Sequence, residues 1–193
     1  MNLLLTFDYE LFFGKPTGTL EKCILEPTEK LISIAQKHDV HYTFFIDIGY
    51  IIQLEKGAQK FQSLSDDYNQ VVKQIKKLQR LGHDLQLHIH PHWDFAEFDG
   101  EQWNIDIDGH YKLADFNDAQ ATDIIIRYKK ALEDLLGEKV EGFRAGGWCL
   151  QPFSRFSKAF KENGIKKDST VRHDLKALLL RFQKGTKQRK IQL

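Results

Sequence analysis

The sequence predicts an α/β fold built around a mostly parallel sheet or barrel. Short apolar segments of strand type alternate along the chain with longer segments of helical periodicity. Polar and potentially reactive residues follow three of the predicted strands, as they do where the carboxyl ends of parallel strands form an active site. With 193 residues, the chain is long enough for one domain with a hydrophobic core.

The first half of the chain is expected to contain three strands and two helices. The apolar segment Asn2–Phe7 predicts a buried strand, since a Gly- and Pro-bearing loop follows it. A proline in the first turn and an apolar stripe predict a helix over Glu26–Lys37. Residues of high β propensity predict a second strand over Val40–Ile46. A helix over Asp67–Leu81, closed by a glycine, then leads into a third strand over Asp84–Leu87.

The second half continues the alternation. An amphipathic segment followed by glycine predicts a helix over Asp118–Leu136. Val140–Arg144 is expected to be a fourth strand, Phe153–Asn163 a helix and Ile165–Val171 a fifth strand. The 93–116 segment is a long insertion between the two halves. Within it, the Asp108-Gly109 pair predicts a hairpin turn. The insertion is expected to be either a lid or a partner surface.

Composition excludes several classes of protein. The net charge of +1 gives no reason to expect nucleic-acid or anionic-membrane binding, and 41% hydrophobic residues indicate a globular chain. Cys23 and Cys149 match no zinc or redox spacing, which fits a reducing compartment. The N-terminus lacks the features of a signal peptide, and no apolar run approaches the roughly 18 residues of a membrane span. These features predict a cytoplasmic protein without a membrane span.

The segment Gly82–Trp93 is the most unusual part of the sequence. It holds four of the eight histidines, and three of them, His88, His90 and His92, occupy alternate positions. Because neutral imidazole is the commonest metal-ligand side chain, this spacing favours a metal site over a polar loop that happens to be rich in histidine.

Two further clusters follow predicted strands. Asp8 and Glu10 are separated by one residue, so one carboxylate can bind a cation while the other removes a proton from water. Arg144 can pair with the basic carboxylate and keep it oriented and ionised. Taken singly, these residues are also compatible with ordinary loop acids and a structural ion pair, and Trp148 with a core position.

These motifs, in order and spacing, resemble those of the polysaccharide deacetylase family (the NodB homology domain). The resemblance rests on Thr6–Glu10, Gly82–His92 and Phe143–Trp148, with further matches at Thr43–Phe45 and Asp168–Thr170. It implies a distorted (β/α) barrel with fewer than eight repeats. It also implies metal-dependent hydrolysis of an N- or O-acetyl group on a carbohydrate.

The resemblance also assigns roles to individual residues. It implies that Asp8 is the catalytic base and that Arg144 orients it. Glu10, His88 and His92 are expected to bind a divalent metal, with zinc as the expected ion. His90 lies outside the usual histidine pair and is either a spare ligand or, as we place it here, a substrate contact. Trp93 and Trp148 are expected to contact the substrate.

The end of the chain departs from the family pattern. Members of the family normally continue through further βα units and supply a late histidine as the general acid, whereas only His173 follows here. We therefore expect a deacetylase-like domain over residues 1–171, incomplete at its C-terminal end, and a divergent basic tail over residues 172–193. The missing histidine leaves two hypotheses open: a deacetylase acting on an acetylated glycan or sugar, or an inactive remnant that binds metal or glycan. The sequence does not decide the oligomeric state.

Overall fold

A five-stranded parallel sheet forms the centre of the molecule. The computed structural model describes residues 4–12 and 17–170, and the side chain of Trp148 is outside this description. The strand order is β1-β2-β3-β6-β7, with bounds Thr6–Tyr9, Thr43–Asp47, Asp84–Ile89, Gly142–Ala145 and Lys167–Asp168. Within the described residues, β1 and β7 each pair on one side only, so the sheet is open. The α/β class is confirmed, and the open sheet corresponds to an incomplete barrel.

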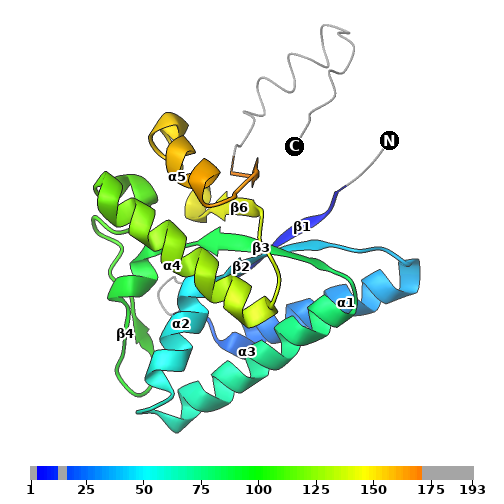
Figure 1. Cartoon of the computed structure of the whole chain (residues 1–193). Helices are drawn as coiled ribbons and strands as arrows, with labels where there is room; N and C mark the ends of the chain where they lie inside the picture. The colour runs from blue at the N-terminus through cyan, green and yellow to red at the C-terminus, as the bar shows by residue number, and fades with distance from the viewer. Residues whose placement is uncertain (1–3, 13–16, 171–193) are drawn as a thin grey trace, which may run out of the picture.

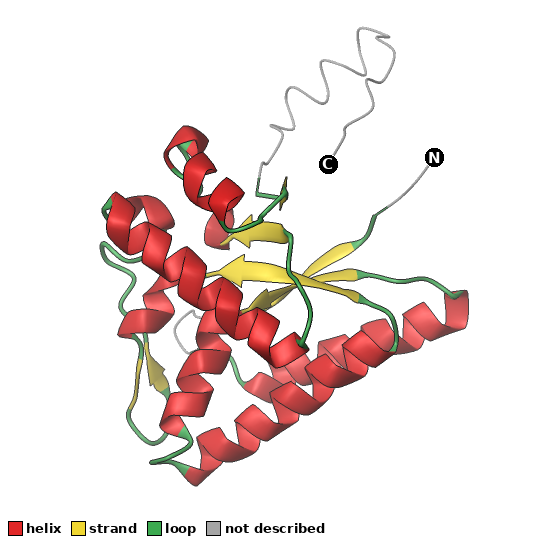
Figure 2. Ribbon diagram, in the orientation of Figure 1, coloured by secondary structure: helices red, strands yellow, loops and turns green. Residues whose placement is uncertain are grey.

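Helices cover one face of this sheet (Figures 1 and 2). The α-helices are α1 (Glu26–His38), α2 (Ile48–Gly57), α3 (Gln62–Arg80), α4 (Asp118–Leu136) and α5 (Ser157–Glu162). Helices α1 and α3 run side by side, and Lys77 of α3 pairs with Glu29 of α1 at 2.5 Å. Figure 1 shows α4 crossing beside β3. None of the helices in the described part of the chain is both long and apolar enough to cross a membrane.

The two faces of the sheet have different chemistry because side chains alternate along a strand. Phe44 and Ile46 of β2 and Leu87 of β3 belong to the hydrophobic core under the helices. Phe45 lies on the other face, where the guanidinium of Arg144 sits 4.0 Å from the centre of its ring. The face away from the helices therefore carries the charged groups.

Several elements differ from their predicted bounds. The first strand begins at Thr6 rather than near Asn2, because Leu4 and Leu5 are exposed and only Leu5 O, which accepts from Thr43 N, reaches the neighbouring strand. Residues 2 and 3 lie outside the described residues. Helix α2 was not predicted, since its apolar residues follow β2 without a loop.

The hairpin in the 93–116 insertion forms at a different place from the predicted one. Strands β4 (Glu97–Phe98) and β5 (Trp103–Asn104) pair antiparallel, so the chain turns at residues 99–102. Asp99 stabilises this turn by accepting hydrogen bonds from the backbone N–H groups of Glu101 and Gln102, both at 2.9 Å. The predicted turn at Asp108-Gly109 is a separate bend without flanking strands. The hairpin therefore turns where the Asp99 side chain accepts backbone hydrogen bonds, and not at the Asp108-Gly109 pair.

The parallel register brings residues distant in sequence to one edge of the sheet. Asp47 at the end of β2 lies beside His88 of β3, and His88 lies beside Arg144 of β6. Glu10 directly follows β1. Since the strands are parallel, the residues at their carboxyl ends meet at the same edge, where α/β proteins place their sites.

Candidate metal and catalytic site

One carboxylate and two histidines form a compact group at this edge. The Glu10 Oε2 atom lies 3.0 Å from His88 Nε2 and 2.6 Å from His90 Nε2. The ligand atoms of the three residues lie within 4.8 Å of one another. The histidine side chains are 2% and 3% exposed, whereas Glu10 is 34% exposed, so the group opens on the Glu10 side. Two imidazoles and one carboxylate are a donor set that suits zinc with one position left for water or substrate.

The backbone of β6 fixes which nitrogen of His88 faces the group. The His88 Nδ1 atom lies 2.9 Å from the carbonyl oxygen of Arg144, and because a carbonyl only accepts, Nδ1 carries the hydrogen. Nε2 is thus directed at Glu10. Metal-binding histidines commonly use this arrangement, in which a hydrogen bond from one nitrogen orients the other toward the ion.

The ionisation of Glu10 and that of His88 depend on each other. Burial alone would raise the pKa of the Glu10 carboxyl, but the hydrogen bonds and charges of His88 and His90 hold that pKa well below its usual range. Burial alone would lower the pKa of His88, but the hydrogen bond to Glu10 and the charges of Asp47 and Asp8 raise it. The Glu10 carboxyl and the His88 imidazole thus shift each other's pKa in opposite directions.

Asp8 lies beside this group and is held by Arg144. The Arg144 Nη1 atom donates to Asp8 Oδ1 at 2.5 Å, and the side chains are 11% and 26% exposed. Nη2 donates to Thr6 Oγ1 at 2.8 Å and to Ser169 Oγ at 2.9 Å. Together with Phe45 beneath the guanidinium, these contacts orient Arg144, and its ion pair holds the Asp8 carboxylate.

The structure places the two outer histidines differently from the expectation. His90, expected as a substrate contact, belongs to the group with Glu10 and His88, whereas His92, expected as a ligand, does not. His92 is 0% exposed, with its ring centre 5.0 Å from that of His90 and 5.3 Å from that of Trp93. Burial, followed by the charge of His90, lowers the pKa of His92 to about 3. The chain turns into the 3₁₀ helix η2 (Pro91–Phe95) after His90, which separates the two side chains.

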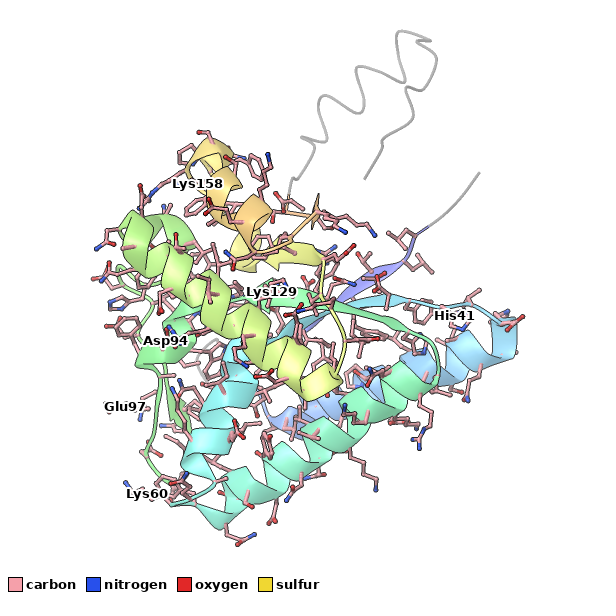
Figure 3. The ribbon with its side chains drawn as sticks, in the orientation of Figure 1. His41, Lys60, Asp94, Glu97, Lys129 and Lys158 are labelled. Carbon is pink, nitrogen blue, oxygen red and sulfur yellow. The ribbon has the colours of Figure 1, made fainter. Side chains whose placement is uncertain are left out.

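Trp93, expected to contact the substrate, lies in the core. Its side chain is 0% exposed, and its Nε1–H donates to Asp47 Oδ2 at 2.6 Å. In this position it supports the histidine segment from below. Asp94, labelled in Figure 3, attaches the same segment to α4 by accepting from Arg127 Nη2 at 2.7 Å and Tyr128 Oη at 3.0 Å. The side chain of Trp148 and all of His173 lie outside the described residues.

Asp47 is a residue near the site that the sequence analysis missed. It is 2% exposed, and its Oδ1 atom has no hydrogen-bond partner among the described residues. Burial raises the pKa of Asp47 to about 6, although the charges of His90 and His88 oppose the rise. The sequence feature that could have identified Asp47 is its position at the carboxyl end of β2, because the other site residues also lie at or directly after strand ends. A buried negative charge here favours a cation at the neighbouring histidines.

Comparison with known proteins identifies relatives of the chain. Residues 2–151 match the family model described as polysaccharide deacetylase. Among solved structures, the fold resembles that of a protein from Mycobacterium smegmatis described as a polysaccharide deacetylase, with 21% identity and a TM-score of 0.56 over 87% of this chain and 50% of that one. The Bc1960 peptidoglycan N-acetylglucosamine deacetylase matches with 20% identity and a TM-score of 0.49 over 86% of this chain and 55% of that one. The chain thus spans about half the length of these solved structures. No curated protein matches the chain.

The geometry predicts which histidine variant loses metal. Purified His90→Ala should retain less than about a tenth of the wild-type zinc, because one of the three residues that could hold the ion is removed. His92→Ala should retain most of it, since His92 lies outside the group. Elemental analysis after dialysis against zinc measures both, with circular dichroism to verify folding. Loss of zinc from a folded His92→Ala protein, with zinc kept by His90→Ala, would restore the assignment made from sequence.

Asp47 is predicted to strengthen metal binding without being a ligand. Asp47→Asn keeps the shape of the side chain and an acceptor for Trp93 but removes the charge. We expect zinc affinity to fall by about 10- to 100-fold, the usual cost of changing a residue behind the ligands. Competition with a chelator of known affinity measures the change. The exposed Asp66 on α3 provides the control variant Asp66→Asn, and equal affinities for the two variants would show that Asp47 has no such role.

Metal affinity is also predicted to fall at low pH. Since zinc binds neutral imidazole, the proton on His88 competes with the ion, and the raised pKa of His88 places this competition above pH 6.5. Below the raised pKa, affinity should fall by about tenfold for each pH unit, and well above it the affinity should level off. Zinc titrations between pH 6 and pH 9 test this. Constant affinity across that range would mean that zinc does not displace a proton from His88.

Proposed function

Because the chain belongs to the polysaccharide deacetylase family, we propose that it removes an acetyl group from an N- or O-acetylated carbohydrate with the help of a bound divalent metal. The observation that carries the proposal is the meeting of two groups at one sheet edge. The Glu10, His88 and His90 group supplies metal ligands, and the Asp8–Arg144 pair supplies an oriented carboxylate beside it. Family members are hydrolases, and this pairing of a cation site with a base suits hydrolysis.

Glu10, His88 and His90 would hold the metal, and zinc is the ion that their chemistry favours. The fit rests on the bridging position of Glu10 Oε2 between the two Nε2 atoms and on the orientation of His88 by the Arg144 carbonyl. When bound, zinc supplies Lewis-acid polarisation of the acyl oxygen and makes water more acidic. We thus propose His90 as a ligand in place of His92.

Asp8 is the proposed general base. As the oxygen of a water molecule attacks the acyl carbon, Asp8 accepts the proton that this water loses. The carbon–nitrogen or carbon–oxygen bond to the sugar then breaks, and the proton passes to the leaving amine or hydroxyl, giving acetate and the deacetylated sugar. Arg144 donates a hydrogen bond to Asp8 and so orients its carboxylate.

The alternative function is a metal- or glycan-binding protein with little or no turnover. The placement of the other histidines favours it. His83 Nδ1 accepts a hydrogen bond from the Tyr42 backbone N–H at 3.1 Å, and the His110 ring stacks on Phe95. Within the described part of the chain, the group that could hold a metal consists of Glu10, His88 and His90 and includes no further histidine.

The decisive variant is Asp8→Asn. We expect acetate release by the zinc-loaded protein from a chitin tetrasaccharide or from acetylated xylan to fall by at least about 100-fold, because a general base contributes that much or more. Zinc content should stay unchanged, since Asp8 is not among the ligands.

The control is Asp134→Asn, which changes an exposed carboxylate on α4 and should leave both quantities unchanged. Loss of zinc together with activity in Asp8→Asn would contradict the separate roles of Asp8 and Glu10. A zinc-loaded wild-type protein that releases no acetate from either carbohydrate would favour the binding protein.

A further inference from the structure

Two adjacent glycines after β6 make room for two side chains at the site. A Cβ atom at Gly146 would lie 2.4 Å from His90 Nδ1, and a Cβ atom at Gly147 would lie 2.1 Å from the hydroxyl oxygen of Tyr111. Neither position therefore tolerates a side chain without movement of these groups. Gly147 also has a φ of +58°, which glycine adopts most easily. The same short turn thus lies against the ring of His90, which belongs to the Glu10, His88 and His90 group, and next to it against the phenol of Tyr111.

The position of Tyr111 is fixed by its neighbours in the 93–116 insertion. The His110 ring stacks on that of Phe95, with 3.7 Å between their centres and 9° between their planes. Leu113 on the other side is 1% exposed. Asp115 accepts a hydrogen bond from the Lys112 backbone N–H at 3.0 Å. Contacts on both sides hold the segment in place, so Tyr111 is presented to the turn by a supported backbone.

The electrostatic surroundings keep the phenol protonated. Burial, followed by the charges of Cys149 and Glu10, raises the pKa of Tyr111. The side chain is only partly buried. A neutral phenol in this place is a hydrogen-bond donor for a bound molecule.

We propose that Tyr111 is a further catalytic residue, whose hydroxyl donates a hydrogen bond to the acyl oxygen of the substrate as negative charge develops there. This inference rests on the proposed function. A donor whose position is fixed before the reaction stabilises such charge without rearrangement, and this is commonly a large part of catalysis. In this proposal the 93–116 insertion forms a wall of the site.

The test is Tyr111→Phe, which removes only the hydroxyl and keeps the ring against Gly147. We expect kcat for acetate release by the zinc-loaded protein to fall by about 100- to 1,000-fold, the usual effect of removing one such donor. KM should change by less than about threefold, and zinc content should not change. Tyr68→Phe is the matched control, because the Tyr68 hydroxyl donates to Glu55 at the exposed surface of α3. An unchanged kcat, or an effect confined to KM, would overturn the proposal.

A binding measurement separates this inference from the proposed function. Acetate, the product that carries the acyl oxygens, is titrated into zinc-loaded wild-type and Tyr111→Phe proteins. We expect acetate to bind about 5- to 10-fold more weakly to the variant, as the loss of one hydrogen bond implies. If the wild type releases no acetate from either carbohydrate, the proposed function fails, and the titration alone decides the contact made by Tyr111. Equal acetate affinities, or no zinc-dependent acetate binding by the wild type, would overturn that contact.

Discussion

The position of Arg144 is the constraint on which the rest of the site depends. Its side chain holds Asp8 at 2.5 Å, while its backbone carbonyl accepts the hydrogen of His88 Nδ1 at 2.9 Å. Asp8 and Arg144 belong to strands that are separated by β2 and β3, so the guanidinium must cross the face of the sheet above Phe45. One residue of β6 thus aligns the proposed base with the metal group, and any change of register in the sheet would disturb both.

The histidine segment depends on a second layer of packing beneath it. Trp93 is buried, and its indole hydrogen bond to Asp47 connects η2 to the end of β2. Trp93 fits there because Gly49 has no side chain, since a Cβ atom at that position would lie 2.9 Å from both Trp93 Cβ and Tyr128 Cε2. Helix α2 begins directly after β2, and its second residue is small enough to admit the indole. The placement of His90 is in this way a consequence of core packing.

The face of the sheet opposite the helices carries polar side chains. Polar groups on that face satisfy one another. Thr43 Oγ1 donates to Asp84 Oδ2 at 3.0 Å, and Gln86 Oε1 accepts from the Gly142 and Glu141 backbone N–H groups. These side chains find hydrogen-bond partners on, or directly before, the neighbouring strands of the same sheet.

The sequence by itself determined the α/β class, the bounds of α4 and the clustering of Asp8, Glu10, His88 and Arg144 at strand ends. These features follow from local periodicity and from the direction of parallel strands, and both can be inferred from a single sequence. Only the tertiary structure decided which histidine joins His88, where the hairpin turns, and that Asp47 and Tyr111 approach the site. The spacing of His88, His90 and His92 is compatible with several ring directions. The turn after His90 and the packing of Trp93 select one of them, and both depend on contacts with residues that are distant in sequence.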